Sequence, residues 1–398
     1  MNILHINDKI ENSGGVETNI TQLVHLGKDY GLFGIWIGIY AIDENLEIKI
    51  YPNDEVVFSG NHSSFFVFIQ KYIKEKEIEI IHLHSLSSPK IIDFFFNLKP
   101  VVRSIHEPRI LCPGQGKFLR KSEKICTKPY GLHCIYDAYK EGCCNRHPKR
   151  LLEAYNNVKW ETTKGNKKYS ALIANSTYII NEAKKVGFNK DKLHLNPHMT
   201  PLIEVEELQD RSNAKCKSLL YVGRLSRTKG VHYFIKLGVE LLKKGHNITL
   251  DIVGDGHDKS YFEGLIPKEY LKHFKFHGWQ TRKEINNFFE NSYLLVFPSI
   301  YPEAFGISGI EAMMQGKPVV GFDVGGVSTW LKHNKTGYLV PVKDEQLMLN
   351  KIERLINDTE QYRLMSKHSR SIALNEFQPK NHMNKLKEIY EICLNENK

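Results

Sequence analysis

Two glutamates with seven residues between them, Glu303 and Glu311, carry the clearest chemical signal in the sequence. Glu303 precedes an expected helix over residues 305–315, and Glu311 lies within that helix. Gly306 and Gly309 stand between the carboxylates and allow another group to pack closely. Paired carboxylates in this setting can accept hydrogen bonds from two sets of sugar hydroxyl groups. The helix dipole alone also favours acidic residues near a helix N-terminus, so a purely structural explanation stays open.

Two cations, Arg224 and Lys229, lie in a glycine-containing turn between an expected strand over residues 218–222 and an expected helix over residues 230–243. A forked guanidinium, a compact ammonium and backbone N–H groups together suit a pyrophosphate. The structural alternative is that both side chains are solvated at an ordinary helix start.

Glycines follow two other expected strands. Gly14 and Gly15 lie between a strand over residues 1–6 and a helix over residues 16–28, where the helix N-terminus offers free N–H groups to a phosphate. Gly254 follows a later expected strand. Neither position completes a dinucleotide-binding fingerprint, because a third glycine is missing at the required spacing. An ordinary turn is the alternative for both.

Five of the seven cysteines fall between residues 107 and 150, together with His133 and His147, and they are Cys112, Cys126, Cys134, Cys143 and Cys144. Thiolate and imidazole ligands suit zinc or an iron–sulfur cluster. The segment is poor in apolar residues, so either a metal held by the first three cysteines and one of the last two, or packing against the first domain, would order it. Disulfides and free thiols are the alternatives, because no CxxC pair is present.

Short apolar runs alternate with longer stretches of helical period along the chain, as expected for βαβ units with parallel sheets. The expected strands cover residues 1–6, 34–40, 78–82, 101–105, 171–174, 218–222, 248–253, 274–277, 294–297 and 318–322. The expected helices cover residues 16–28, 230–243 and 305–315, and one more follows residue 174 and ends at residue 184. Residues 107–150 break the pattern, and we interpret them as an insertion without regular periodicity.

The length of 398 residues fits two domains better than one core. A polar stretch over residues 197–214 suits a linker. We therefore predict one domain over residues 1–198, a second over residues 199–376, and a C-terminal helix over residues 377–398 that packs back on the first domain. Open parallel sheets bind ligands at the carboxyl ends of their strands, so two such domains should face each other across a cleft.

The formal net charge is +10, with basic clusters at residues 117–124, 146–150 and 164–168. These clusters are either solvated surface or attracted to anionic lipid head groups or a phosphorylated acceptor. No nucleic-acid-binding motif is recognisable, so no nucleic acid partner is expected. The N-terminus lacks a secretory signal, and the most apolar stretch, residues 31–42, is shorter than the roughly 20 residues that span a bilayer. We expect a cytoplasmic protein, with peripheral contact at the inner face of the membrane as the finer hypothesis.

Arg224 with Lys229, and Glu303 with Glu311, resemble the signatures of family 4 retaining glycosyltransferases, also called glycosyl transferases group 1. The match is dense over residues 217–345 and sparse but ordered over residues 1–200. The resemblance implies an α/β chain of the GT-B fold, with two Rossmann-like doubly wound parallel-sheet domains facing across a cleft. The first would be the acceptor-side domain and the second the nucleotide-sugar donor domain.

The resemblance also implies roles for matching residues. Residues that would bind the donor are Gly14, Gly15, Arg224, Lys229, Gly254, His277, Glu303, Phe305, Gly306, Ile307 and Glu311. Arg224 and Lys229 would bind the diphosphate, Glu303 the sugar hydroxyls, and Glu311 the ribose. His106 follows the strand over residues 101–105 and matches a family histidine that lines the sugar site, although a lone histidine is commonly structural. The implied catalytic set is His106, Arg224, Lys229 and Glu303.

The implied reaction moves a hexose from a nucleoside diphosphate sugar to a sugar or lipid-linked acceptor hydroxyl with retention of configuration, in glycan, exopolysaccharide or glycolipid synthesis. No Asp-x-Asp motif is evident near the donor site, so Arg224 and Lys229 would replace a divalent ion and catalysis would require no cofactor. Two alternatives stay open: a sugar-nucleotide epimerase of the same fold, and a non-catalytic sugar-nucleotide-binding subunit.

Overall fold

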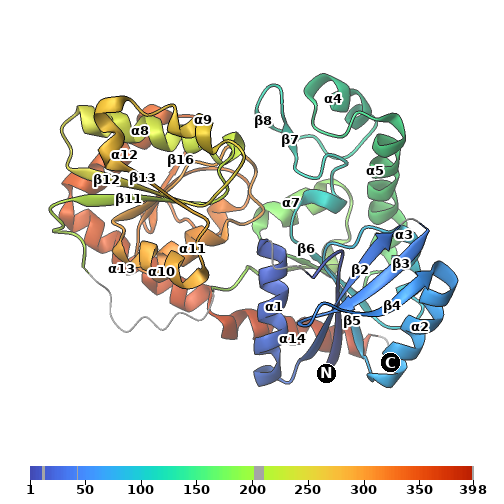
Figure 1. Cartoon of the computed structure of the whole chain (residues 1–398). Coiled ribbons are helices and arrows are strands. Elements are labelled where there is room, and N and C mark those ends of the chain that lie inside the picture. Colours follow the sequence, from blue (N-terminus) through green and yellow to red (C-terminus); the bar gives the residue numbers. More distant parts are fainter. Residues whose placement is uncertain (11–13, 43, 201–209, 397–398) are drawn as a thin grey trace. The chain divides into compact units, whose positions relative to one another are not determined.

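The computed structural model describes residues 1–10, 14–42, 44–200 and 210–396, and these form two compact units (Figure 1). The first unit comprises Met1–His198 and Pro379–Lys398, and the second comprises Met199–Gln378. The sequence analysis places its boundaries after residues 198 and 376, so the second boundary differs by two residues. Residues 201–209, which belong to the expected linker, lie outside the described residues.

An eight-stranded sheet forms the core of the first unit (Figure 1). In spatial order its strands are β10 (Leu193–Leu195), β9 (Ala171–Ala174), β6 (Val101–Ile105), β5 (Ile80–Leu83), β1 (Asn2–Asn7), β2 (Phe33–Ile42), β3 (Asn45–Ile50) and β4 (Glu55–Asn61). The strands from β10 to β2 are parallel, and β5, β6 and β9 are buried throughout, which explains why their sequences are mainly apolar.

The expectation of an all-parallel sheet is wrong at the edge formed by β3 and β4. Strands β3 and β4 pair antiparallel with β2 and with each other, so the sheet is mixed. The sequence analysis did not predict β3, β4 or the short β10. Strands β3 and β4 leave much of their surface partly or fully exposed, so their sequences lack the apolar runs that mark buried strands.

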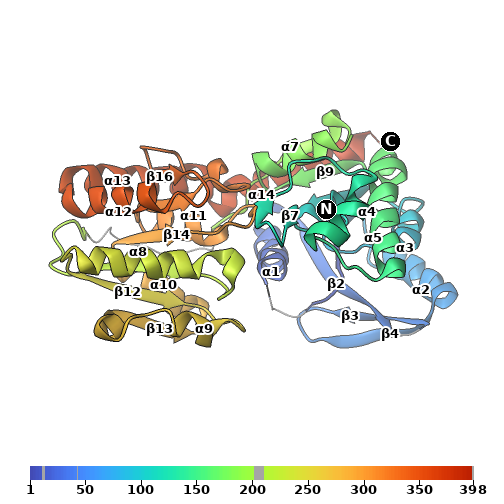
Figure 2. The ribbon, with the colours of Figure 1, turned by 90° about the horizontal axis from the view of Figure 1, so that it is seen from above.

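Helices cover the first sheet: α1 (Gly15–Gly27), α2 (His62–Glu75), α3 (Pro89–Phe95), α7 (Thr177–Lys185) and α14 (Pro379–Asn395). The Ser176 side chain caps α7 by accepting a hydrogen bond from the Ile179 N–H. Helix α14 comes from the end of the chain and packs beside α1 (Figures 1 and 2). It buries Met383, Leu386 and Ile389, so the chain end completes the first unit.

The insertion between β6 and β9 contains regular structure that the sequence analysis did not predict. It comprises β7 (Phe118–Leu119), β8 (Lys124–Ile125), α4 (His133–Glu141), α5 (Pro148–Trp160), a π-helical turn at Glu161–Gly165 and α6 (Asn166–Lys168). Helix α4 buries only Asp137 and Ala138, and α5 buries only Leu151 and Val158. Helix α4 and the turn before it nevertheless have apolar residues at helical spacing, namely Leu132, Ile135, Tyr136 and Tyr139, which are exposed, and the sequence analysis missed this pattern.

The second unit contains a six-stranded parallel sheet. Its spatial order is β13 (Phe274–Gly278), β12 (Ile248–Val253), β11 (Lys217–Val222), β14 (Leu294–Phe297), β15 (Val319–Phe322) and β16 (Gly337–Val340). Helices α8 (Val231–Lys243) and α9 (Lys259–Glu263) lie on one face, and α10 (Arg282–Asn291), α11 (Ile307–Met314) and α13 (Thr359–Glu376) lie on the other (Figure 1). Helix α12 (Glu345–Asn357) contacts both α8 and α13. This is the doubly wound arrangement expected from the sequence.

None of the helices in the described part of the chain combines the length and the apolar character that spanning a bilayer requires.

Candidate active site

The loop after β11 carries the two cations that the sequence predicts for a pyrophosphate. It contains a 3₁₀ turn at Arg227–Lys229 and leads into α8 through Gly230, whose φ of 77° lies in the left-handed region. A Cβ atom on Gly230 would lie 1.9 Å from the carbonyl oxygen of Pro298, so only glycine lets this loop pack against the loop after β14. Gly254 likewise lets two loops pack closely, because a Cβ atom on Gly254 would lie 2.0 Å from the Gly223 carbonyl oxygen. These close approaches bring the loops after β11, β12 and β14 together.

Lys229 and Glu303 form the central ion pair of this region. The Lys229 Nζ atom lies 2.6 Å and 2.8 Å from the two carboxylate oxygens of Glu303. The Ser299 hydroxyl donates to the same carboxylate at 2.7 Å, and the Gly326 N–H donates to the Glu303 backbone oxygen at 2.6 Å. Since β11 and β14 are neighbouring parallel strands, their carboxyl ends bring both side chains to one edge of the sheet.

Helix α11 begins at Ile307, two residues later than predicted, because Gly306 has a φ of 94°. The Trp330 Nε1–H donates to the Phe305 carbonyl at 2.6 Å, and a Cβ atom on Gly309 would lie 2.1 Å from the Trp330 ring. The tryptophan therefore fixes both the entry to the helix and its first turn. The first N–H groups of an α-helix have no intrahelical partner, so they can bind a phosphate or sugar oxygen.

Glu311 lies in the same helix, with only 7% of its surface exposed. One of its carboxylate oxygens lies 3.0 Å from the Arg282 guanidinium, which comes from α10. Burial raises the pKa of Glu311, and the positive charge of Arg282 opposes this shift. A buried carboxylate with one exposed arginine partner can accept hydrogen bonds from ligand hydroxyl groups.

Arg224 differs from Lys229 because its side chain is exposed and pairs with no acidic residue in the part of the chain that the structure describes. The Tyr221 hydroxyl donates to the Arg224 backbone oxygen at 2.9 Å and so holds the loop in place. Burial and the charge of Glu303 raise the pKa of Tyr221, so this hydroxyl keeps its proton. The Arg224 guanidinium therefore remains available to an anionic ligand.

His277 has a structural partner in the second unit. Its Nε2 atom lies 2.8 Å from a carboxylate oxygen of Asp251, and its ring packs on Phe288. The ring is thus positioned by β12 and α10 rather than left as an isolated side chain at the strand end.

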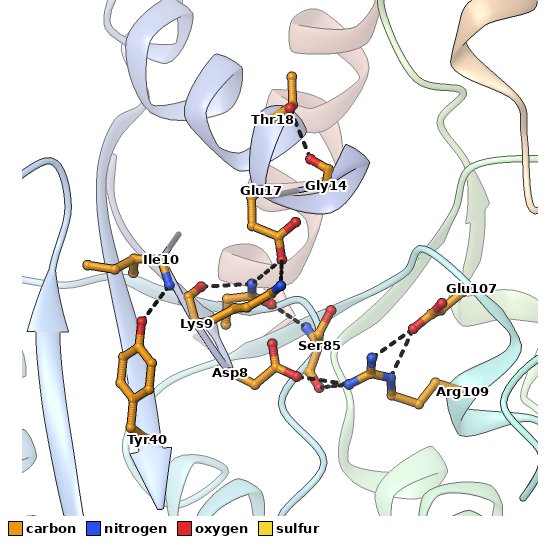
Figure 3. Close-up of polar contacts among 11 residues, drawn as sticks. Asp8, Lys9, Ile10, Gly14, Glu17, Thr18, Tyr40, Ser85, Glu107 and Arg109 are labelled. Atoms are coloured by element: carbon orange, nitrogen blue, oxygen red, sulfur yellow. Dashed lines mark hydrogen bonds and ion pairs between the residues drawn. The ribbon is translucent and has the colours of Figure 1, made fainter. Parts of the chain in front are cut away.

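In the first unit, Gly14 occupies the N-cap position of α1, and Gly15 is the first residue of the helix. The Thr18 hydroxyl donates to the Gly14 carbonyl. The buried Glu17 side chain lies beneath Gly14 in the view of Figure 3. A Cβ atom on Gly14 would lie 2.8 Å from a Glu17 carboxylate oxygen. Glycine at this position therefore lets the Glu17 carboxylate lie against the N-terminus of α1.

Arg109 connects the loops after three strands of the first sheet (Figure 3). Its guanidinium lies 2.9 Å from carboxylate oxygens of both Asp8 and Glu107, and it also donates to the Ser85 carbonyl at 3.3 Å. The Asn7 side chain adds a second connection, because its Oδ1 accepts from the Ser85 N–H at 3.0 Å. The sequence analysis missed this network, which joins the carboxyl ends of β1, β5 and β6.

His106 lies at the end of β6, and burial lowers its pKa to about 3, with smaller contributions from Arg103, His382 and Arg109. The imidazole is therefore neutral at physiological pH. Its Nε2 atom lies 2.8 Å from His84 Nδ1, and its ring stacks on His198 with centroids 5.6 Å apart.

His106 belongs to a larger group of buried histidines that the sequence analysis did not predict, namely His5, His82, His84, His198 and His382. Ring nitrogens of His5, His82 and His84 lie within 4.8 Å of one another, a spacing compatible with a metal ion. The His82 nitrogens, however, contact the Tyr390 hydroxyl at 2.6 Å and the Ser104 hydroxyl at 2.8 Å, so they are already hydrogen-bonded. His5, His82, His84 and His106 lie in or directly after β1, β5 and β6, which are neighbours in the sheet. Their proximity can be recognised only once the strand order is known.

A comparison with known proteins identifies the second unit. Residues 204–372 match the model of the family described as glycosyl transferases group 1. The matched segment contains every residue of the site built around Lys229 and Glu303. The second unit matches the group 1 glycosyltransferases, and the protein is a glycosyltransferase.

Two curated relatives and one solved structure extend this similarity. A protein of Klebsiella pneumoniae, described as an uncharacterised 41.2 kDa protein in the cps region, is 26% identical over 98% of this glycosyltransferase and 99% of its own length. The alpha-D-kanosaminyltransferase of Streptomyces kanamyceticus is 26% identical over 59% of this chain and 64% of its own. The crystal structure of Anabaena HepE in complex with UDP has a TM-score of 0.68 at 18% identity, and it covers 98% of this chain and 100% of that one. At that identity the likeness establishes the fold, which is GT-B.

The predicted site residues of the glycosyltransferase fall into two groups. The second unit brings Lys229, Glu303, Gly306 and Glu311 to the edge formed by β11 and β14, with Arg224 in the same loop as Lys229. The residues Gly14, Gly15 and His106 belong to the first unit. The five cysteines of the insertion also belong to the first unit, and all are free thiols.

Proposed function

We propose that this glycosyltransferase transfers a hexose from a nucleoside diphosphate sugar to an acceptor hydroxyl with retention of configuration, as a family 4 enzyme. The observation that carries the proposal is the Lys229–Glu303 pair together with Arg224, which lies in the same loop as Lys229 and pairs with no acidic residue among those that the structure describes. The two cations match the charge of a diphosphate, and the carboxylate matches the hydroxyl groups of a sugar.

In this mechanism, the bond between the anomeric carbon and the diphosphate oxygen breaks, and that oxygen keeps the electron pair. The acceptor oxygen forms its bond to the anomeric carbon on the same face, and its proton passes to the leaving diphosphate. Arg224 and Lys229 stabilise the charge that develops on the leaving group. The Glu303 carboxylate is held by Lys229 and Ser299, which suits hydroxyl binding better than nucleophilic attack.

The diphosphate needs no divalent ion in this proposal, because two cationic side chains and the N–H groups at the start of α11 supply the counter-charge. Glu311 would bind the ribose hydroxyl groups through its buried carboxylate. His106 would bind a sugar hydroxyl as a neutral imidazole. Its low pKa argues against a role as a general base at neutral pH.

The acceptor is proposed to carry an anionic group. A cavity of about 460 Å³ in the first unit is lined by Arg109, Arg120 and Arg150. Arg109 is paired with Asp8 and Glu107, whereas Arg120 and Arg150 are exposed and form no ion pair with any residue that the structure describes. Unpaired guanidinium groups favour a phosphate or carboxylate, as found in lipid-linked diphosphates and acidic sugars.

Peripheral contact with the inner face of the membrane is the finer part of the proposal. Helix α4 and the turn before it expose Leu132, Ile135, Tyr136 and Tyr139, with exposed basic residues at 146, 149 and 150 nearby in the chain. Apolar and aromatic side chains next to basic ones suit an anionic bilayer surface. Sedimentation with vesicles that contain anionic lipid should recover the protein, and neutral vesicles should recover much less. Equal recovery would contradict this part.

Polysaccharide synthesis is the proposed setting, because the Klebsiella relative that matches the whole chain belongs to a cps region. The experiment that tests the proposed function incubates purified protein with UDP-, GDP- and ADP-sugars and candidate acceptors. Nuclear magnetic resonance of the product should show the anomeric configuration of the donor. An inverted product would contradict retention, and an epimerised donor without transfer would favour the epimerase alternative.

A further inference from the structure

Three imidazoles of the first unit form a continuous chain of hydrogen bonds that ends at His106. The Nδ1 atom of His5 lies 3.1 Å from His84 Nε2, and the Nδ1 atom of His84 lies 2.8 Å from His106 Nε2. His5 belongs to β1, His84 directly follows β5, and His106 directly follows β6, and these strands are neighbours in the sheet. The His84 N–H donates to the Ile6 carbonyl at 2.9 Å. The backbone of neighbouring strands therefore fixes the spacing of the three rings.

All three imidazoles are neutral at physiological pH. Burial lowers the pKa of His5 and His106 to about 3, and it is the main cause that lowers the pKa of His84 well below its ordinary value. A neutral imidazole carries one N–H group, and its other ring nitrogen can only accept a hydrogen bond. The three rings thus supply three N–H groups, of which two lie in the hydrogen bonds between the rings. The third must lie at one end of the chain, either on His5 Nε2 or on His106 Nδ1.

The His5 end of the chain is deeply buried against apolar groups. A Cβ atom on Gly34 would lie 3.1 Å from His5 Nε2 and 3.3 Å from Val24 Cγ2, so this side of the ring packs against the backbone of β2 and beside α1. Only 2% of the His5 surface is exposed, and its Nε2 atom forms no hydrogen bond with any residue that the structure describes. An N–H group here would be buried without an acceptor, which is rarer in proteins than an unused acceptor.

The His106 end differs, because this ring is only half-buried and an oxygen atom of a ligand can reach it. Its plane is fixed on two sides. His84 bonds its Nε2 atom, and the His198 ring stacks on it with an interplanar angle of 9°. The Asn175 Nδ2 group donates to both the His106 carbonyl and His198 Nε2, each at 3.1 Å. The third N–H group is therefore better placed on His106 Nδ1, where a partner can approach.

We propose that His84, supported by His5, is a positioning residue that holds His106 as the Nδ1–H tautomer, so that His106 donates a hydrogen bond to an oxygen atom of a sugar substrate. In this arrangement the His5 Nδ1–H donates to His84 Nε2, and the His84 Nδ1–H donates to His106 Nε2. The hydrogen bond at one ring nitrogen of a histidine sets the protonation of the other. The inference rests on the proposed role of His106 in sugar binding and adds that His106 acts as a donor.

The tautomer is measured directly and without turnover. The full-length chain is produced with ¹⁵N-labelled histidine, and two-bond ¹H–¹⁵N spectra distinguish the protonated from the bare nitrogen of each ring. The signals of His106 are those that disappear in His106→Gln. We expect a protonated Nδ1 and a bare Nε2 in the wild type, and loss of this preference in His84→Leu. A protonated Nε2 in the wild type, or an unchanged Nδ1–H tautomer in His84→Leu, would overturn the proposal.

A double-mutant cycle tests whether His84 acts through His106. The variants His106→Gln and His84→Leu should each lower kcat/KM for transfer by about 5-fold, the effect of losing one hydrogen bond to the substrate. In the His106→Gln background, His84→Leu should lower kcat/KM by less than about 2-fold further, because the interaction is already lost. The same loss in both backgrounds would give His84 an independent effect and would overturn the proposal.

The variant His82→Leu is the matched control for removing a buried imidazole. The His82 ring stacks on His84 with centroids 4.2 Å apart, but its nitrogens bond to the hydroxyls of Tyr390 and Ser104. This variant should lower the melting temperature, as His84→Leu does, yet keep the wild-type kcat/KM and the His106 tautomer. A loss of kcat/KM equal to that of His84→Leu would overturn the proposal. Full activity in His106→Gln would contradict the proposed role of His106 in sugar binding, whereas the spectra decide the positioning by His84 separately.

Discussion

Lys229 Nζ contacts both carboxylate oxygens of Glu303, at 2.6 Å and 2.8 Å, although the two residues are 74 positions apart in the chain. The pair joins the loops that follow two neighbouring strands, β11 and β14. The cation proposed for the diphosphate and the carboxylate proposed for the sugar therefore fix each other's position. A substitution at either residue should disturb the binding of both parts of the donor.

The variant Glu303→Gln should lower the rate of transfer at least about 100-fold at saturating donor. The amide loses a charged contact with the sugar and leaves Lys229 without its carboxylate, a loss on the order of 3 kcal/mol in a desolvated site. The rate is measured with purified protein whose circular dichroism matches the wild type. The exposed Glu269, changed to Gln, serves as the control and should retain the wild-type rate. Near-normal transfer by Glu303→Gln would remove Glu303 from the site.

Arg224 and Arg227 offer a matched pair for testing the proposed diphosphate contact. Both are exposed and lie in the same loop, but Arg227 packs over the Tyr261 ring at 4.5 Å. We expect Arg224→Ala to reduce transfer by about 100-fold or more, because it removes a cation that stabilises the leaving group. Arg227→Ala should change the rate only slightly. Equal losses in the two variants would indicate a general effect of loop charge instead.

Stability should fall as the solution becomes acidic, because buried histidines must take up protons on unfolding. Burial lowers the pKa of His5 and His106 to about 3 and that of His382 to about 4, all below the ordinary value of 6.5. The folded state therefore binds fewer protons than the unfolded state below pH 6.5, and stability present above that pH is lost as the pH falls toward 4. The limiting slope is about 1.4 kcal/mol per pH unit for each histidine.

Thermal unfolding between pH 7 and pH 5 measures this effect. The melting temperature should decrease over that range, and the decrease should be smaller in the variant His5→Asn. His257, whose side chain is 80% exposed, provides the control, because His257→Asn should leave the slope unchanged. A melting temperature independent of pH in the wild type would show that the buried histidines titrate normally.

Chelation should leave donor chemistry largely intact, because Arg224 and Lys229 are proposed to replace a divalent ion at the diphosphate. Transfer is compared with and without EDTA. A loss of activity that magnesium or manganese restores would show that the donor site requires a metal ion.

The sequence predicted the parts of the fold that are buried and regular. The strands Val101–Ile105, Ala171–Ala174, Ile248–Val253 and Leu294–Phe297 have the predicted bounds, because parallel strands in the interior of a sheet are mainly apolar and rich in Val, Ile and Leu. Strand β4 and helix α5 were missed because they bury few apolar residues. The alternating Leu46 and Ile48 of β3 and the helical spacing of Ile135, Tyr136 and Tyr139 in α4 are patterns that the sequence analysis overlooked.

In the candidate site, too, the sequence predicted individual residues but not the contacts between them. Lys229 and Glu303 were each predicted as ligand-binding residues from local motifs, but their contact with each other depends on strand order, which no local motif encodes. The histidines around His106 were missed for the same reason, since they come from β1, from β5, from the segments that follow β5 and β10, and from α14. The networks of Arg109 and Asn7 likewise require three strand ends to be neighbours.

The most direct test of the central claim measures nucleoside diphosphate release from a panel of UDP-, GDP- and ADP-sugars. The assay compares the wild type with the double variant Arg224→Ala/Glu303→Gln, in the presence of an acceptor preparation from a polysaccharide-producing cell extract. The account predicts that the wild type releases the diphosphate from at least one donor, and that the double variant, folded as shown by circular dichroism, does so at least about 100-fold more slowly. Release at the same rate by both proteins would contradict the account.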